Sequence, residues 1–134
     1  MPPERSFQHN EAWLASLTET IIGMAIRVHR HLGRGLLETV YTHCLCWELQ
    51  QGGLRLEREA PIAVAYGDVR LPCGYRADVI VEEQVILEIK SVERLVPLHE
   101  AQLLTYLRLS GCRLGLLMNF NGLTLKDGLR RFIR

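Results

Sequence analysis

Apolar residues recur every three or four positions along the first third of the chain. One such stripe predicts a helix with a single buried face over about residues 14–32, and another predicts a second helix over residues 37–51. Gly33 and Gly52 follow these stretches, where a glycine commonly ends a helix. Ser16, with a glutamate three residues later, is the residue we expect to cap the first helix.

The spacing of apolar residues shortens from about 3.6 to two after the second helix, which indicates strands. The predicted strands cover about residues 54–56, 62–66, 75–81 and 85–90.

Helical spacing returns over residues 98–110, after Pro97 and before Gly111. An apolar stretch at residues 114–120 then predicts a strand, and the tail at 123–134 fits either a strand or a short helix. A strand that follows a helix in this way suggests a crossover to a parallel neighbour.

The predicted order is α-α-β-β-β-β-α-β, typical of an α/β (mixed α+β) fold with a central mixed sheet of four to five strands flanked by helices. The length of 134 residues fits one domain spanning 1–134, with residues 1–12 as a loose, polar leader.

The two clearest strands, residues 75–81 and 85–90, are expected to form a hairpin about Glu83. Its register should place residues 77, 79, 81, 85, 87 and 89 on one apolar face, because a slip by one residue would mix apolar with polar positions. The other face then holds Asp78 directly opposite Glu88, with Lys90 on the same side.

Two opposed carboxylates destabilise a sheet unless positive charge offsets them. Lys90 supplies one such charge, and a divalent cation between the carboxylates would supply more; oxygen ligands of this kind suit Mg²⁺ or Mn²⁺. The alternative is a solvent-facing strand pair with ordinary charges. Ile80 and Ile86 share the polar face, which indicates that it is partly covered.

Composition and charge are ordinary for a globular protein, with 48% hydrophobic and 23% charged residues and a net charge of +1. A polyanion would therefore need a local basic patch rather than a global field. Two arginine clusters are candidates for such a patch, although each also fits a solvated helix face: Arg27, Arg30, His31 and Arg34, and Arg130, Arg131 and Arg134.

The chain contains no apolar run long enough to span a bilayer and does not begin like a secretory signal, so we expect a cytoplasmic protein with no membrane partner. Its four cysteines lack the spacing of a zinc site, and free thiols are expected at Cys44, Cys46, Cys73 and Cys112.

The motifs now identified make the sequence similar to the PD-(D/E)xK nuclease superfamily, and within it to the RecB-like "GxxExxY" family. The naming motif stands at residues 35–41, and the superfamily core as Asp78 followed by Glu88-Ile89-Lys90. A following Q-x-x-x-Y motif begins at Gln102. Ala77 stands where the superfamily name has proline. The cysteines do not match the iron–sulfur arrangement of some RecB-type relatives, so no cluster is expected.

The resemblance implies a restriction-endonuclease-like core and assigns roles around the predicted metal. Asp78 and Glu88 would bind it, Glu38 would be an outer ligand, and Lys90 would orient the attacking water or stabilise charge. His29 is a further candidate ligand, with a core histidine as the alternative.

The same resemblance implies substrate-binding roles for Gln102 and Tyr106, which lie four residues apart on one helical face, and for Tyr41. It predicts a metal-dependent nuclease that cleaves phosphodiester bonds in nucleic acid, with DNA the expected substrate. The alternatives are a non-catalytic nucleic-acid-binding module and a scaffolding module on the same fold. A homodimer or a partner protein is compatible with the small size of the chain.

Overall fold

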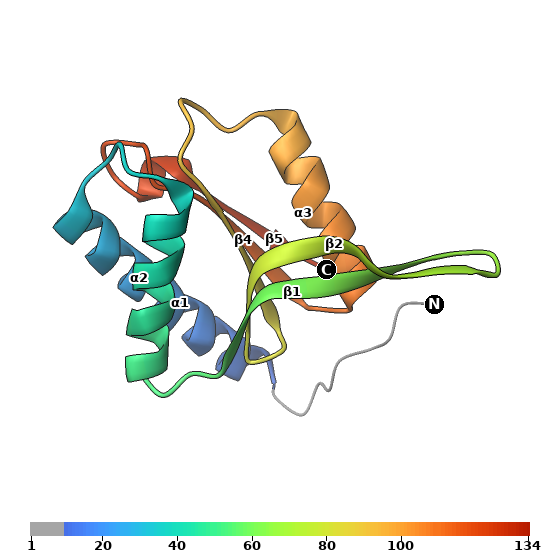
Figure 1. Cartoon of the computed structure of the whole chain (residues 1–134). Helices are drawn as coiled ribbons and strands as arrows, with labels where there is room; N and C mark the ends of the chain where they lie inside the picture. The colour runs from blue at the N-terminus through green and yellow to red at the C-terminus, as the bar shows by residue number, and fades with distance from the viewer. Residues whose placement is uncertain (1–9) are drawn as a thin grey trace.

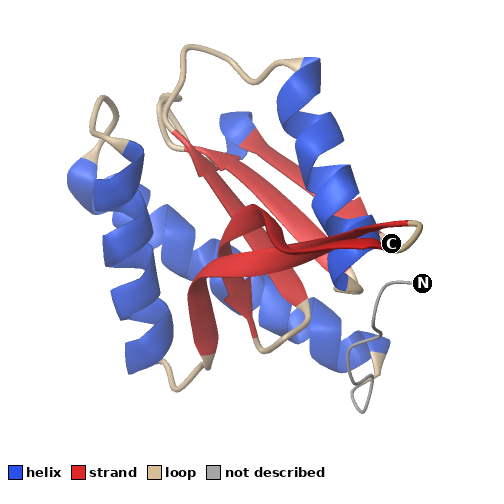
Figure 2. Ribbon diagram, turned by 45° about the vertical axis from the view of Figure 1, so that its right-hand side comes forward, coloured by secondary structure: helices blue, strands red, loops and turns tan. Residues whose placement is uncertain are grey.

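Within residues 10–134, five strands form one mixed sheet, and helices cover both of its faces (Figures 1 and 2). The computed structural model describes residues 10–134, so most of the predicted leader lies outside the described residues. The elements are α1 (Glu11–Leu32), α2 (Glu38–Gln51), β1 (Leu56–Tyr66), β2 (Val69–Val81), β3 (Val85–Lys90), α3 (Pro97–Ser110), β4 (Leu114–Asn119), the 3₁₀ turn η1 (Lys126–Gly128) and β5 (Leu129–Ile133).

The strands lie in the order β1-β2-β3-β4-β5, so neighbours in the sequence are neighbours in the sheet. β3 and β4 are parallel, whereas the other three pairs are antiparallel. α3 connects the two parallel strands, which confirms the predicted crossover and the predicted fold class.

Each face of the sheet has its own apolar core. Side chains of α1 and α2 pack against one face, where Val85, Leu87 and Ile89 of β3 point. α3 covers the other face, which contains Ile80 and Ile86. Because β3 and β4 are buried on both sides, their sequences are almost continuously apolar instead of alternating. A polar residue on either strand is therefore exceptional.

The helices end where the glycines predicted, but α1 begins earlier than predicted. Gly33 and Gly111 have positive φ angles of 74° and 77° at the ends of α1 and α3. The cap of α1 is Asn10, whose side chain accepts a hydrogen bond from the Trp13 N–H at 2.9 Å. The prediction of Ser16 as the cap was wrong, because helical spacing of apolar residues reveals the buried stripe and not the polar turn before it.

Two strands predicted before residue 67 are a single strand, β1, which runs through Pro61. Proline has no N–H to donate and is tolerated in an edge strand, the position of β1 in the sheet. The ambiguous tail contains η1 and the opposite edge strand, β5. Within residues 10–134 no helix combines the length and the apolarity needed to cross a membrane.

Candidate active site

The backbone ladder between β2 and β3 ends at the pair Val79 and Leu87. One residue further along, the side-chain carboxylates of Asp78 and Glu88 accept the hydrogen bonds that backbone carbonyls would accept in a regular ladder. The Asp78 N–H donates to Glu88 Oε1 at 3.1 Å, and the Ile89 N–H donates to Asp78 Oδ2 at 2.8 Å. The two acids, which we call the acid pair, are therefore side by side where the two strands separate, as the hairpin register predicted.

Regular pairing is also interrupted on the other side of Asp78. Glu59 of β1 has a positive φ of 48°, which only a small fraction of residues other than glycine adopt. Ala77 packs in the α3-side core with Ile80, not with Val79 as the alternation predicted. That prediction was wrong because the strand is distorted at Asp78, so residues 77 and 79 do not share a face.

Burial and like charge dominate the electrostatics of the acid pair. Glu88 is only 5% exposed. Its burial, together with the charge of Asp78, raises its pKa from 4.5 to about 8 despite the opposing effect of Lys90. Burial also raises the pKa of Asp78, although the Ile89 N–H and the Lys90 charge oppose the shift. In the absence of another cation, Glu88 therefore holds a proton at neutral pH.

Glu38 lies in the first turn of α2 and reaches the end of β3. Its Oε2 accepts a hydrogen bond from the Ser91 N–H at 3.2 Å, directly after Lys90. The Ser91 hydroxyl in turn donates to the Leu36 carbonyl at 2.6 Å. The charge of Glu38 raises the pKa of Asp78, so it contributes to the field at the acid pair. A recess of about 350 Å³ opens here, lined by Leu36, Leu37, Glu38, Thr39 and Ser91.

Tyr41 is fully buried and supports the segment that leads to Glu38. Its hydroxyl donates to the Gly33 carbonyl at 2.6 Å and accepts from the Leu36 N–H at 3.1 Å. Its ring stacks on Phe120, with centroids 4.7 Å apart. Tyr41 has no exposed surface with which to touch a substrate, so the structure places it as an anchor of the loop between α1 and α2.

The Q-x-x-x-Y residues of α3 differ in their exposure. Tyr106 is mostly buried, and its pKa is raised by burial and then by the charges of Glu88 and Asp78. Its ring contacts that of Tyr75 at a centroid distance of 5.5 Å. Gln102, one turn earlier, is exposed. Tyr106 therefore lies within electrostatic range of the acid pair, whereas Gln102 is exposed to solvent on the same helix.

His29 is directed into the protein interior. Its Nε2 lies 2.9 Å from the Gly122 carbonyl oxygen, and its ring centroid lies 6.2 Å from that of Phe120. Among the described residues, no three side chains of His, Cys, Asp or Glu converge into a group able to hold a metal. The structure therefore brings Asp78 and Glu88 together on β2 and β3, with Lys90 two residues after Glu88. Glu38 acts on Asp78 through its charge, and His29 contacts Gly122 instead.

Sequence reasoning did not identify Asn119, a buried amide at the end of β4. It pairs with Lys90 in the parallel ladder. Its Oδ1 accepts from the Val92 N–H at 3.1 Å, and its Nδ2 donates to the Val92 carbonyl at 2.9 Å. Through these two hydrogen bonds, Asn119 holds the backbone segment that follows Lys90 in place. The sequence signal that could have identified Asn119 is its polar side chain at the end of an otherwise apolar strand.

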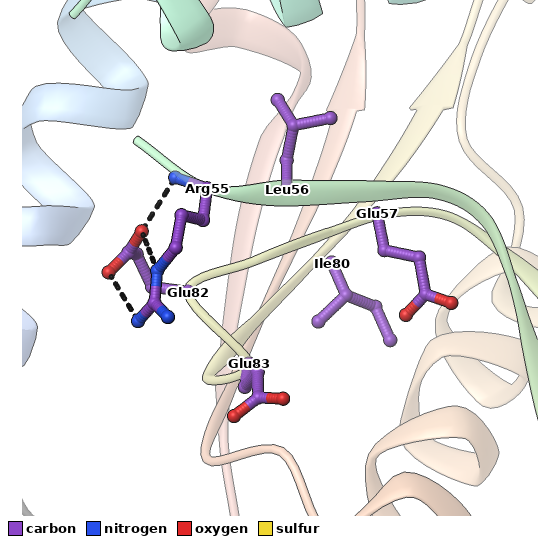
Figure 3. Close-up of a pocket in the computed structure, with 6 residues that line it drawn as sticks. All are labelled: Arg55, Leu56, Glu57, Ile80, Glu82 and Glu83. Atoms are coloured by element: carbon purple, nitrogen blue, oxygen red, sulfur yellow. Dashed lines mark hydrogen bonds and ion pairs between the residues drawn. The ribbon is translucent and has the colours of Figure 1, made fainter. Parts of the chain in front are cut away.

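At the turn between β2 and β3, Arg55 and Glu82 form an ion pair beside a pocket of about 210 Å³ (Figure 3). The Arg55 N–H donates to Glu82 Oε2 at 2.6 Å, and its guanidinium lies 3.4 Å from Oε1. Glu82 and Glu83 both have positive φ angles, as a tight turn requires. This contact stabilises the turn, and with it the register that aligns Asp78 with Glu88.

The four cysteines are free, as predicted. The two arginine clusters are partly engaged by nearby groups. Arg27 lies 3.6 Å from Glu48, and Arg134 donates to the Cys112 and Gly111 carbonyls.

Comparison with known proteins agrees with this geometry. The family model described as the PD-(D/E)XK nuclease superfamily matches residues 15–132, nearly the whole chain. No curated protein and no solved structure matches the chain significantly.

Replacing Tyr41 with phenylalanine should lower the free energy of unfolding by about 1 kcal/mol, because it removes two part-buried hydrogen bonds, to the Gly33 carbonyl and from the Leu36 N–H. The expected result is a lower urea midpoint with an unchanged slope. Tyr66→Phe is the matched control, since Tyr66 is 82% exposed. Equal midpoints for the two variants would contradict the anchoring role of Tyr41.

The stability of the metal-free protein should fall as the pH rises from about 5 to 8. In this range folded Glu88 retains a proton that the unfolded chain has lost, so its contribution is complete below pH 4.5 and is lost as the pH approaches 8. The expected slope is at most about 1.4 kcal/mol per pH unit.

Urea unfolding in EDTA across this range measures the slope. Glu88→Gln should flatten it, whereas Glu83→Gln, at an exposed position of the adjacent turn, should not. A slope that is identical in the wild-type protein and in Glu88→Gln would show that Glu88 does not titrate in this window.

Proposed function

Because the chain belongs to the PD-(D/E)XK nuclease superfamily, we propose that it is a metal-dependent nuclease that hydrolyses phosphodiester bonds in nucleic acid, with DNA as the substrate. The observation that supports this most directly is the acid pair, whose two carboxylates are held together by backbone N–H groups beside Lys90. A like-charged pair that is at least partly buried costs stability, and a function that requires a cation explains why it is present.

The donor groups fit Mg²⁺ or Mn²⁺. Asp78 and Glu88 offer hard carboxylate oxygens, and the raised pKa of Glu88 indicates that Lys90 alone does not balance their charge. Mg²⁺ is usually held by only one or two protein carboxylates, with waters and substrate phosphate as its other ligands, so a third convergent side chain is unnecessary. We place Glu38 in the outer shell, and His29 outside the site because its Nε2 contacts Gly122.

The chemistry follows from the positions of these side chains. A bound divalent cation would lower the pKa of a coordinated water and neutralise charge on the phosphate. Lys90 would orient the attacking water or stabilise the developing charge on the phosphate; its positive charge already acts on both members of the acid pair. Gln102 is exposed on α3 and can contact the bound strand, while Tyr106 borders the acid pair.

Cleavage of labelled DNA in Mg²⁺ or Mn²⁺ should be abolished by EDTA and reduced about 10²–10³-fold by Lys90→Ala, as expected when one stabilising charge is removed from a reacting centre. Glu88→Gln should have at least the same effect. Lys126→Ala, at an exposed position, is the matched control and should retain full activity. Cleavage that survives Lys90→Ala and Glu88→Gln would reject the proposed centre.

Metal binding should also be visible without cleavage. Mn²⁺ at about a hundredfold excess over its Kd should raise the melting temperature by on the order of 10 °C. The rise should be larger at pH 8 than at pH 5, because metal must displace the proton of Glu88 at the lower pH. Differential scanning calorimetry checks this, with Asp78→Asn expected to lose the shift and Glu83→Gln to retain it. An unchanged melting temperature in the wild-type protein would instead favour a metal-free scaffolding role.

A further inference from the structure

Strands β1 and β2 continue past the rest of the sheet as a two-stranded projection, which we call the arm and define as residues 62–75 (Figures 1 and 2). Figure 1 shows it extending beyond α3. On β2 every residue from 69 to 76 is exposed. A hairpin that packs against nothing is only marginally stable in water, so a projection of this kind is best explained by a binding role.

The arm is set off from the sheet by a bulge. Between the pairs Ile62–Tyr75 and Val64–Leu71, β1 has one residue whereas β2 has three, residues 72–74. A Cβ atom at Gly74 would collide with the Val64 side chain, so glycine permits the two strands to cross closely here. Bulges of this kind redirect the strand and its side chains, and this one comes directly before Tyr75.

The exposed side chains of the arm are aromatic, apolar and basic. Tyr66 is 82% exposed and stands opposite Val69, so the two side chains lie on one face. Tyr75 is 43% exposed at the root of the arm. Between residues 62 and 76 the charged residues are Asp68, Arg70 and Arg76, a net positive charge.

The root of the arm is continuous with the candidate site. The ring of Tyr75 contacts that of Tyr106, with centroids 5.5 Å apart. Tyr106 in turn lies close enough to Glu88 and Asp78 to respond to their charges. Arg76 follows Tyr75 and precedes Asp78 by two residues on the same strand. A ligand lying along the arm would therefore lead directly to the acid pair.

We propose that the arm binds a single-stranded segment of the nucleic-acid substrate and guides it to the acid pair. This rests on the proposed nuclease function and specifies the strand preference. Unpaired bases stack on Tyr66 and Tyr75. Arg70 and Arg76 stand one residue from Val69 and Tyr75 and pair with Ala65 and Pro61, so they alternate to the other face of the two strands. Their long side chains contact the phosphates of the bound strand around the edge. Aromatic side chains that bind bases by stacking, together with cationic groups along the backbone, are the general means by which proteins hold single strands.

A duplex fits the same surface poorly. Its bases are already stacked on one another, so exposed tyrosine rings at the edge of the arm have no base face to cover. Duplex binding depends mainly on many phosphate contacts, and the arm with the residue that follows it offers only Arg70 and Arg76, beside Asp68. The complementarity of the arm therefore favours unpaired bases over paired ones.

Binding is tested separately from cleavage in the Lys90→Ala protein with Ca²⁺, by fluorescence anisotropy with a labelled oligothymidylate and with a blunt duplex of equal length. Tyr75→Ala and Tyr66→Ala should each weaken single-strand binding by on the order of tenfold, and should change duplex binding less than twofold. Tyr75→Trp should preserve single-strand affinity, because it preserves the stacking surface. Trp47→Ala, which removes an exposed aromatic residue from α2, is the control and should change neither.

Three results would overturn the inference. The first is an unchanged single-strand affinity in either alanine variant. The second is an equal loss of duplex affinity. The third is a wild-type dimer in sedimentation equilibrium that Tyr66→Ala dissociates without changing single-strand affinity, because the arm would then bind a second copy of the chain.

Cleavage in Mn²⁺ distinguishes the inference from the proposed function. Cleavage that is unaffected by the arm variants would leave the nuclease function intact and reject the role of the arm. Single-strand binding through the arm without any cleavage by the wild-type protein would support the arm and reject the nuclease.

Discussion

The mutual repulsion of two carboxylates, one buried and one partly buried, is the constraint on which the other features of the site depend. Asp78 and Glu88 occupy neighbouring strands where the backbone ladder stops, and each accepts a backbone N–H that the ladder no longer uses. These bonds hold the carboxylates together although burial and like charge favour protonation of Glu88.

Polar contacts hold the segments around the acid pair in place. The Arg55–Glu82 ion pair secures the turn of the hairpin. At the opposite end, Asn119 holds the backbone of Val92, and Tyr41 holds the loop before Glu38. Each contact joins segments that are separated in the sequence. The contacts of Asn119 and Tyr41 hold the segments next to the strand end that carries Lys90, and the proposed catalysis requires such preorganisation.

The proposed chemistry and the proposed recognition are located on different kinds of structure. The acid pair lies on strands buried between two apolar cores, where little movement is available and electrostatic interactions are strong. The arm and Gln102 are exposed, where side chains can adapt to a flexible strand. β2 joins the two regions, since the exposed Tyr75 and the partly buried Asp78 are three residues apart on it. The bulge at residues 72–74 redirects β2, so that this strand contributes residues both to the arm and to the acid pair.

The sequence by itself determined the periodic elements and the pairing of the acids. Apolar spacing predicted the three helices, glycines marked their ends, and the hydrophobic pattern of the hairpin aligned Asp78 with Glu88, because each of these depends on residues close together in the chain. Tertiary structure decided which side chains are buried and which residues they contact, because local spacing cannot predict these features. Tyr41 is buried because Phe120 stacks on it, and His29 points inward to Gly122, which is 93 residues away. The displacement of Ala77, the passage of β1 through Pro61 and the projection of the arm likewise depend on neighbouring strands. Burial is a property of contacts between distant segments, so those residues acquired their roles only when the sheet assembled.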